Sequence, residues 1–259
     1  MSLLLYGIGA LALAACSPNG AQVGNAAPAA AASDEPDYLS PPELASASSV
    51  DGRLQLSGLA APGAAVRLAS PGGAALFATA DAAGHWSLPL PLSPDARLFN
   101  LSMSNAGRVI QARGYLFVAP DGAAARLRAG GGTELLAASG GLAPLALDYD
   151  KQRAVTLSGR AGPGEDVSLH VDGVERGEAV ADPDGRFVLS FNQPITPGPH
   201  TFDLVGATAE TKFIAPIAPP APLSGTPFAA AKSAGGWRVD WLTPGGGEQV
   251  TLLFARAAA

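Results

Sequence analysis

The sequence contains one pattern twice, and this repetition constrains the fold more than any other feature. Leu56-Ser57-Gly58 returns 101 residues later as Leu157-Ser158-Gly159. At the same offset the matching pairs are Pro62 and Pro163, Gly63 and Gly164, Val66 and Val167, Leu68 and Leu169, Asp81 and Asp182, Gly84 and Gly185, Trp86 and Phe187, and Leu88 and Leu189. Phe117-Val118-Ala119-Pro120 matches Phe213-Ile214-Ala215-Pro216 at an offset of 96, which predicts a shorter second copy. An internal duplication predicts two similar structural units.

Both copies alternate apolar and polar residues, which is typical of half-buried β-strands. Val167-Ser168-Leu169-His170-Val171 shows this period. The segments between such stretches consist of turn-forming residues, namely Gly162-Pro163-Gly164, Asp172-Gly173, Asp182-Pro183-Asp184-Gly185 and Pro197-Gly198-Pro199. The chain has 32 Gly and 23 Pro among its 259 residues, and these residues break helices but punctuate sheets. The sequence therefore predicts an all-β fold.

The order of these motifs resembles that of the bacterial immunoglobulin-like modules of surface and envelope proteins. The motifs that carry the resemblance are Leu-Ser-Gly, Pro-Gly-x-x-Val, Asp-x-x-Gly-x-aromatic-x-Leu and Pro-Gly-x-His. The resemblance implies two tandem immunoglobulin-like β-sandwiches, which we place at residues 51–120 and 151–216, with a connector at 121–150. A transthyretin-like sandwich has similar turn motifs and is the alternative topology.

The start of the chain resembles the signal peptide of a bacterial lipoprotein. An apolar run from Leu3 to Ala15 precedes Cys16, which is the only cysteine, and Leu13-Ala14-Ala15-Cys16 is similar to a lipobox. The resemblance implies removal of residues 1–15, a diacylglycerol thioether on Cys16 and acylation of the new N-terminus. Ser17 in place of an aspartate favours the outer membrane, facing the periplasm. The alternative is an ordinary secretory signal.

Residues 16–50 are predicted to be a lipidated, disordered tether between the membrane and the folded part. They consist mainly of Ala, Pro, Ser, Gly and Asn, and their only charged residues are Asp34, Glu35, Asp37 and Glu43. Such a composition buries too little apolar surface to offset the loss of conformational entropy on ordering.

Residues 217–259 are predicted to form a Pro/Ala linker and a C-terminal β-hairpin around the turn Pro244–Gly247. Counting outward from this turn places Trp241 opposite Val250, Val239 opposite Leu252 and Trp237 opposite Phe254, with all six side chains on one face. A face with two tryptophans is expected to be covered. It packs either against the second sandwich or the connector, or against a partner protein, because tryptophan is enriched at interface hot spots.

Catalytic, metal and cofactor signatures are not found in the sequence. The net charge is −6, which leaves no basic footprint for nucleic acid. The histidines His85, His170 and His200 lie far apart, without metal-ligand spacing, and no Gly-x-Ser-x-Gly or nucleotide-binding glycine motif follows a strand. Asp182-Pro183-Asp184-Gly185 resembles the start of a calcium loop, but the first copy reads Asp81-Ala82-Ala83-Gly84. We therefore expect plain β-turns at both positions, no catalytic residue, no metal site and no cofactor.

These observations favour a non-catalytic cell-envelope lipoprotein that presents immunoglobulin-like modules as a scaffold or binding subunit. Its expected partners are the membrane, through Cys16, and an envelope protein or glycan. The alternative is an accessory protein in which a sandwich binds carbohydrate or peptidoglycan. Sugar binding needs exposed aromatic side chains, for which Tyr115, Tyr149, Trp237 and Trp241 are the candidates.

Overall fold

The computed structural model describes residues 38–130, 132–136, 140–152, 154–233 and 235–254. Within these ranges the chain forms β-strands and turns and no helix, which confirms the all-β prediction. Accordingly, none of these residues belongs to a helix with the length and hydropathy needed to cross a membrane. The predicted signal peptide, Cys16 and the tether up to residue 37 lie outside the described residues.

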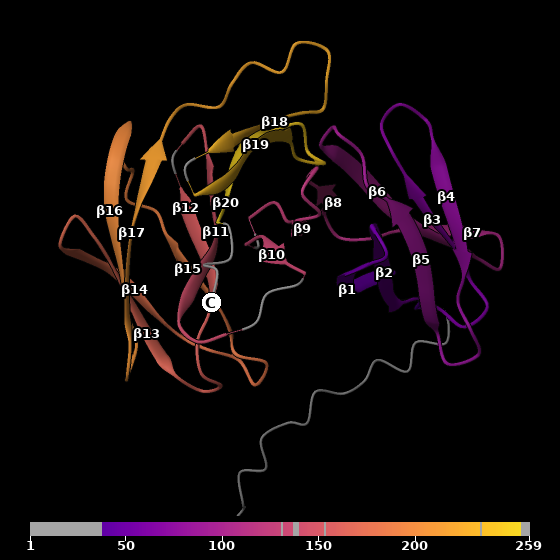
Figure 1. Cartoon of the computed structure of the whole chain (residues 1–259), viewed down its shortest axis with the longest axis horizontal. Coiled ribbons are helices and arrows are strands. Elements are labelled where there is room, and N and C mark those ends of the chain that lie inside the picture. Colours follow the sequence, from indigo (N-terminus) through magenta and orange to yellow (C-terminus); the bar gives the residue numbers. More distant parts are fainter. Residues whose placement is uncertain (1–37, 131, 137–139, 153, 234, 255–259) are drawn as a thin grey trace, which may run out of the picture. The chain divides into compact units, whose positions relative to one another are not determined.

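The first copy forms two sheets around one core (Figure 1). One sheet has the order β1-β2-β5, and the other has the order β10-β9-β8-β6-β3-β4 with β7 also beside β6. The strands are β1 (Glu43–Val50), β2 (Arg53–Leu59), β3 (Ala65–Ala69), β4 (Ala75–Thr79), β5 (His85–Pro91), β6 (Arg97–Asn105), β7 (Arg108–Gln111), β8 (Tyr115–Val118), β9 (Ala124–Leu127) and β10 (Glu134–Leu135). Leu56, Val66, Leu68, Trp86 and Leu90 lie in the core between the sheets.

The second copy repeats this arrangement and extends one of its sheets. The sheets have the orders β15-β12-β11-β20-β19-β18 and β14-β13-β16-β17. The strands are β11 (Ala143–Asp150), β12 (Val155–Arg160), β13 (Asp166–Val171), β14 (Val174–Val180), β15 (Arg186–Phe191), β16 (Gly198–Val205), β17 (Glu210–Ile217), β18 (Phe228–Ser233), β19 (Gly236–Leu242) and β20 (Glu248–Phe254). The core of this copy includes Leu157, Leu169, Phe187, Phe202 and Leu204.

The strand order in both copies is immunoglobulin-like. The first, second and fifth strands form one sheet, and the third, sixth and seventh form the other, as in immunoglobulin domains. The fourth strand pairs with the third in each copy, β4 with β3 and β14 with β13. The predicted tandem immunoglobulin-like sandwiches are therefore confirmed, and the two copies have the same topology.

The repeated Leu-Ser-Gly motif is explained by close packing of its glycine under an aromatic ring. Gly58 lies opposite Trp86, and Gly159 lies opposite Phe187. A Cβ at Gly58 would lie 2.8 Å from the Trp86 ring and closer still to a carbonyl oxygen of the neighbouring strand, and a Cβ at Gly159 would collide with the Phe187 ring. Both rings are only 2% exposed. The prediction that Trp86 and Phe187 hold the same core position is confirmed.

The repeated aspartate closes the turn before the fifth strand in each copy. Oδ1 of Asp81 accepts hydrogen bonds from the backbone N–H groups of Ala83 and His85, at 2.8 and 2.9 Å. Oδ1 of Asp182 accepts the corresponding hydrogen bonds from the backbone N–H groups of Asp184 and Arg186, at 2.9 and 2.8 Å. The glycines that follow, Gly84 and Gly185, have positive φ angles of 86° and 74°, which favour glycine. The Asp182 carboxylate therefore stabilises a β-turn, as the sequence predicts.

The sequence match of Phe117–Pro120 with Phe213–Pro216 differs by one residue from the equivalence that strand pairing gives. Phe99 pairs with Leu116 in the first copy, whereas the equivalent Phe202 pairs with Phe213 in the second. Leu116 therefore faces the core of its own module, and Phe117 faces the opposite side of the sheet. The sequence match, at an offset of 96, therefore differs by one residue from the structural equivalence of Leu116 with Phe213.

Several strands lie outside the module boundaries expected from sequence. β1 lies within the predicted tether, residues 16–50, and β9, β10 and β11 lie within the predicted connector, residues 121–150. β1 consists largely of Ala and Ser, so its composition resembles that of a tether although its pairing with β2 makes it a strand. Tertiary pairing outweighs composition in such segments. The folded first module begins earlier than predicted, and the predicted connector contributes strands to both modules.

Candidate functional site

The C-terminal hairpin is an integral part of the second module. β20 pairs along β11, with Leu252 opposite Leu147, and so adds β20, β19 and β18 to the sheet. Val250 and Leu252 enter the core of the second module, and the half-buried Phe254 packs against it with its ring 4.8 Å from that of Phe213. Half of the predicted docking residues therefore serve the interior of the second sandwich.

The predicted register of the hairpin is wrong by one residue. Trp241 pairs with Gln249, Val239 with Thr251, and Trp237 with Leu253. The loop runs from Thr243 to Gly247, because the Thr243 N–H donates to the Gly247 carbonyl oxygen at 2.8 Å and pairing begins with Leu242 and Glu248. A shift of one residue moves every side chain of a strand to the other face. The six side chains Trp237, Val239, Trp241, Val250, Leu252 and Phe254 therefore do not share one face.

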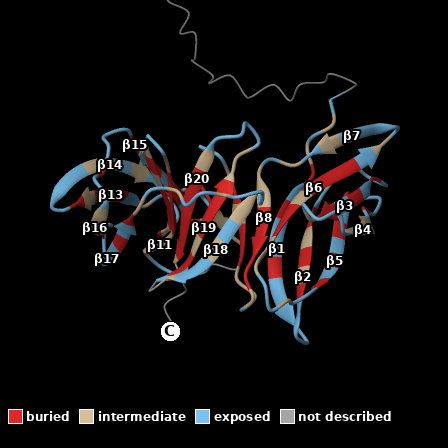
Figure 2. Ribbon diagram, turned by 90° about the horizontal axis from the view of Figure 1, so that it is seen from above, coloured by how far each residue is buried: buried red, intermediate tan, exposed pale blue. Residues whose placement is uncertain are grey.

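The tryptophan face of the hairpin covers the outer side of the first module. A third buried cluster joins the two modules and consists of Leu98, Phe117, Ala119, Ala125, Leu127, Ala146, Trp237, Val239, Trp241 and Leu253. The ring of Trp241 contacts Tyr115 edge-on at 5.9 Å, and that of Trp237 lies 6.4 Å from Phe117. Trp241 is 0% and Trp237 9% exposed, and the buried residues of β19, β20 and β8 are evident in Figure 2. We call this cluster the junction; its tryptophans offer no exposed docking surface.

An ion-pair network borders the junction. Trp237 Nε1 donates to both carboxylate oxygens of Asp121, at 3.0 and 3.2 Å. Lys232 Nζ donates to Asp121 at 2.5 Å and lies 4.6 Å from the centre of the Trp237 ring. Partial burial opposes ionisation of Asp121, but the hydrogen bonds from Lys232 and Trp237 outweigh it, so the pKa of Asp121 is lowered.

A buried carboxylate ties the connector to the second module. Asp148 on β11 accepts hydrogen bonds from the N–H and hydroxyl of Thr133 at 2.7 and 2.8 Å, from Thr251 at 2.5 Å and from Gln249 at 3.2 Å. Thr251 in turn accepts a bond from Trp241 Nε1 at 3.0 Å. Burial raises the pKa of Asp148, although these donors oppose the shift. Sequence analysis missed this network, because Thr133 and Asp148 carry no motif.

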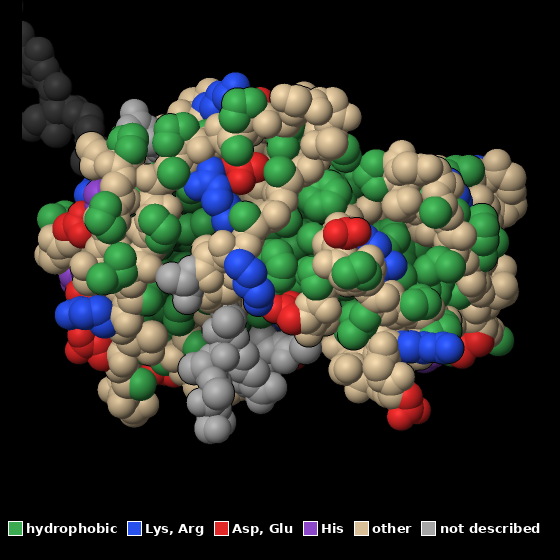
Figure 3. All heavy atoms as spheres, turned by 45° about the horizontal axis from the view of Figure 1, so that its top comes forward, with side chains coloured by type: hydrophobic (Ala, Val, Ile, Leu, Met, Phe, Trp, Pro, Cys, Tyr) green, Lys and Arg blue, Asp and Glu red, His purple; other side chains and the backbone are tan. Residues whose placement is uncertain are grey.

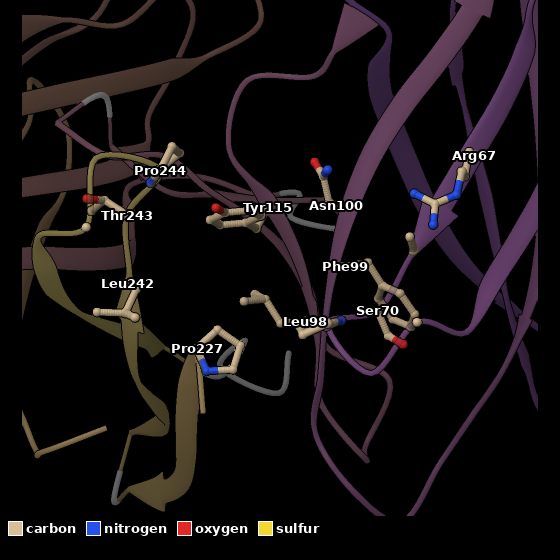
Figure 4. Close-up of a pocket in the computed structure, with 14 residues that line it drawn as sticks. Arg67, Ser70, Leu98, Phe99, Asn100, Tyr115, Pro227, Leu242, Thr243 and Pro244 are labelled. Atoms are coloured by element: carbon tan, nitrogen blue, oxygen red, sulfur yellow. The ribbon is translucent and has the colours of Figure 1, made fainter. Parts of the chain in front are cut away.

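A cleft of about 600 Å³ lies beside the junction (Figure 4). Its floor is the outer face of the first module, with Arg67 from β3, Asn100 from β6 and Tyr115 from β8. Its wall is formed by the second module, through Pro227, Leu242, Thr243, Pro244 and Gly246. The space-filling view shows hydrophobic side chains gathered in the middle of the visible face (Figure 3). The volume falls within the range of roughly 300–1,000 Å³ that is usual for small-molecule sites.

Beyond the cleft the outer face of the first module stays open. Phe77 on β4 lies directly opposite Arg67 on β3, so both side chains are on this face, and Phe77 is 67% exposed. Of the four aromatic residues predicted as open, only Tyr115 lines the cleft, because Tyr149, Trp237 and Trp241 are buried. Arg67, Asn100 and Phe77 were missed, since strand pairing alone brings them together.

The histidines take part in separate local contacts. His85 Nδ1 lies 3.7 Å from Asp81 in the first module. His200 Nδ1 lies 2.6 Å from Asp172 in the second, and its Nε2 is 2.8 Å from the carbonyl oxygen of Thr196. Within the ranges that the structure describes, no group of three or more His, Cys, Asp or Glu side chains is arranged to hold a metal ion.

Comparison with known proteins gives only distant structural similarities. No protein-family model matches the sequence, and no curated protein matches it. A solved structure of a central fibronectin-III array of RIM-binding protein is 11% identical over 86% of this chain and 88% of its own, with a TM-score of 0.27. A tetra-tandem repeat from the extending region of a large adhesion protein is 15% identical over 81% of this chain and 64% of its own, with a TM-score of 0.23.

A third similar structure is the BSP domain of a biofilm-associated protein. It is 14% identical over 71% of this chain, with a TM-score of 0.24, and this chain covers 30% of its length. TM-scores this low carry no argument about function. The immunoglobulin-like assignment therefore rests on the strand order of the two modules.

Proposed function

We propose that this chain is a non-catalytic cell-envelope lipoprotein whose two immunoglobulin-like modules act as one binding unit at the membrane surface. The observation that carries the proposal is the junction, in which Trp237 and Trp241 of the second module are buried against Leu98, Phe117 and Leu127 of the first. Modules joined only by a linker are expected to move independently. A buried apolar contact of this kind instead holds two modules in one relative orientation, so that one ligand can contact both.

The attachment part of the proposal rests on the lipobox-like sequence that ends in Cys16. Each buried CH₂ of an acyl chain contributes ~0.8 kcal/mol to membrane binding, and two chains anchor a protein stably. The Pro- and Ala-rich segment that follows gives the folded modules reach from the bilayer. This arrangement suits a subunit that presents a surface to other envelope components.

Replacement of Cys16 by serine tests the anchor. We expect wild-type protein to incorporate radiolabelled palmitate and to fractionate with the outer membrane, and the Cys16→Ser variant to be unlabelled and soluble in the periplasm. Ser17→Asp is the matched control, because it keeps Cys16 and should retain the label while moving the protein to the inner membrane. Wild-type protein without label, or a Cys16→Ser variant that stays with membranes, would contradict the proposal.

A second candidate function, binding of carbohydrate, is favoured by one observation. Phe77 is highly exposed on the same face as Arg67 and beside the cleft. Exposed aromatic rings stack on the apolar faces of sugars.

A further inference from the structure

We infer that the cleft and the open face beside it form a binding site for an acidic saccharide. This inference rests on the proposed binding function and names the ligand class and the site. The site consists of Arg67, Phe77, Asn100 and Tyr115 of the first module and Thr243 of the second.

The charge of the cleft selects an anion. Among the described residues, Arg67 is the one charged residue that lines it, although the chain as a whole has a net charge of −6. Among the described residues the Arg67 guanidinium has no ion pair or hydrogen-bond partner. A guanidinium binds a carboxylate through two parallel hydrogen bonds. A ligand carboxylate would therefore meet an available cation, and the lining residues that the structure describes include no competing acid.

The neutral polar groups of the cleft suit a ligand with several hydroxyls. The amide nitrogen of Asn100 donates to Gln111 at 2.8 Å, which leaves its oxygen to accept from a ligand. The Thr243 hydroxyl accepts from the Gly247 N–H at 3.1 Å, which leaves its proton to donate. The Tyr115 hydroxyl has no partner in the described part of the chain and can do both. These groups come from floor and wall, so they surround a ligand rather than follow one strand.

The aromatic rings supply the apolar surface that sugar binding needs. Phe77 lies opposite Arg67 at the rim of the open face, and Tyr115 lies inside the cleft with its ring held edge-on by Trp241. Ring faces at the two ends of a polar and cationic surface fit a chain of sugar units. An acidic peptide would pair its backbone with a free strand edge. It would therefore make fewer contacts with groups that are spread across the face of the sheet.

The second copy provides an internal comparison. Its strand pairing places Ser168 and Glu178 where the first copy has Arg67 and Phe77, and Asp203 where it has Asn100. Asp203 is paired with Lys212 at 3.2 Å. The corresponding face therefore has the exposed carboxylate of Glu178 in place of the exposed ring, and Ser168 in place of Arg67. The features of the site belong to the first copy alone, and the second module contributes the wall.

Binding of trigalacturonate by the purified full-length protein in detergent, measured by isothermal titration calorimetry, tests the inference. The neutral methyl ester of the same trisaccharide and triglutamate are the comparison probes. We expect trigalacturonate to bind more tightly than either. Arg67→Gln should weaken this binding about tenfold, as loss of a charge-assisted pair does, and Phe77→Ala several-fold. Glu178→Gln, the matched change in the second copy, should leave the affinity unchanged.

Three results would overturn the inference. They are equal binding of trigalacturonate and its ester, an Arg67→Gln variant with unchanged affinity, and tighter binding of triglutamate, which would indicate a site for acidic peptides. None of these results affects palmitate labelling or the position of the two modules, so failure of this inference is distinguishable from failure of the proposed function.

Discussion

Trp237 Nε1 donates a hydrogen bond to Asp121 Oδ2 at 3.0 Å, although the two residues lie 116 positions apart and in different modules. The same indole ring is buried against Phe117 of the first module and carries Lys232 over its face. One side chain of the C-terminal hairpin thus makes an apolar, a cation–π and a charge-assisted contact at the boundary of the modules. The tryptophan face of the hairpin, which the sequence predicts to be covered, packs against the first module.

Trp237→Phe should lower the free energy of unfolding by about 1 kcal/mol, because it keeps most of the packing but removes the donor to a part-exposed carboxylate. The pKa of Asp121 is lowered in the folded state, so its contribution is present above about pH 4 and lost as the pH falls through the lowered pKa. The difference between wild type and variant, measured by urea unfolding, should therefore shrink in acid. A difference that grows in acid would contradict this role of Asp121.

Gly58→Ala should destabilise the first module by about 1–3 kcal/mol or more, because its Cβ would collide with the Trp86 ring and the backbone of β1. Gly72→Ala is the matched control, because nothing lies within 4 Å of a Cβ at that position, and it should change stability by less than about 0.5 kcal/mol. Equal losses of stability in the two variants, measured by thermal unfolding, would show that close packing under the ring does not explain the repeated Leu-Ser-Gly motif.

Trp86→Ala should cost about 3–5 kcal/mol, as large aromatic truncations in cores do. Trp86→Phe makes the first copy resemble the second at this position. It should cost only about 1–2 kcal/mol, for lost volume and for the hydrogen bond from Nε1 to the Leu59 carbonyl oxygen at 3.2 Å. Calorimetry of both variants checks this order. Similar losses for both substitutions would contradict the equivalence of Trp86 and Phe187.

Asp148→Asn should destabilise the protein by about 1–3 kcal/mol, because the amide nitrogen brings two N–H groups to a site where four donors already converge. The pKa of Asp148 is raised in the folded state. Its contribution is therefore fully present below about pH 4 and is lost as the pH rises through the raised pKa. The stability difference between wild type and variant should decrease with rising pH. An increase would mean that the four donors hold Asp148 ionised.

The repeated elements could be predicted from sequence because local pattern carries them. Alternation, the turn at Asp81 and Asp182, and the shared core position of Trp86 and Phe187 each depend on residues close together in the chain. The register of β20 could not be predicted, because a loop of four residues and one of five fit the same glycine-rich turn. The hydrogen bonds between Thr243 and Gly247 and the pairing of Leu242 with Glu248 belong to the longer loop.

The candidate site was largely hidden from sequence for a related reason. Arg67, Phe77 and Asn100 lie on three strands with no shared motif, and their common face follows from strand pairing. Thr243 reaches the same cleft only because the hairpin joins the second module and turns toward the first. Tyr115 was predicted as an open aromatic residue. Its position inside the cleft depends on the hairpin, which places Trp241 against its ring.

The distance between the modules in solution is the measurement on which the proposed single binding unit depends. In the Cys16→Ser chain, which has no other cysteine, Thr79→Cys on β4 and Glu210→Cys on β17 place one spin label on an exposed strand position of each module. Double electron–electron resonance should give one narrow distance distribution, which Trp241→Ala broadens. A broad distribution before that substitution would show that the two modules move independently and that the junction does not hold them.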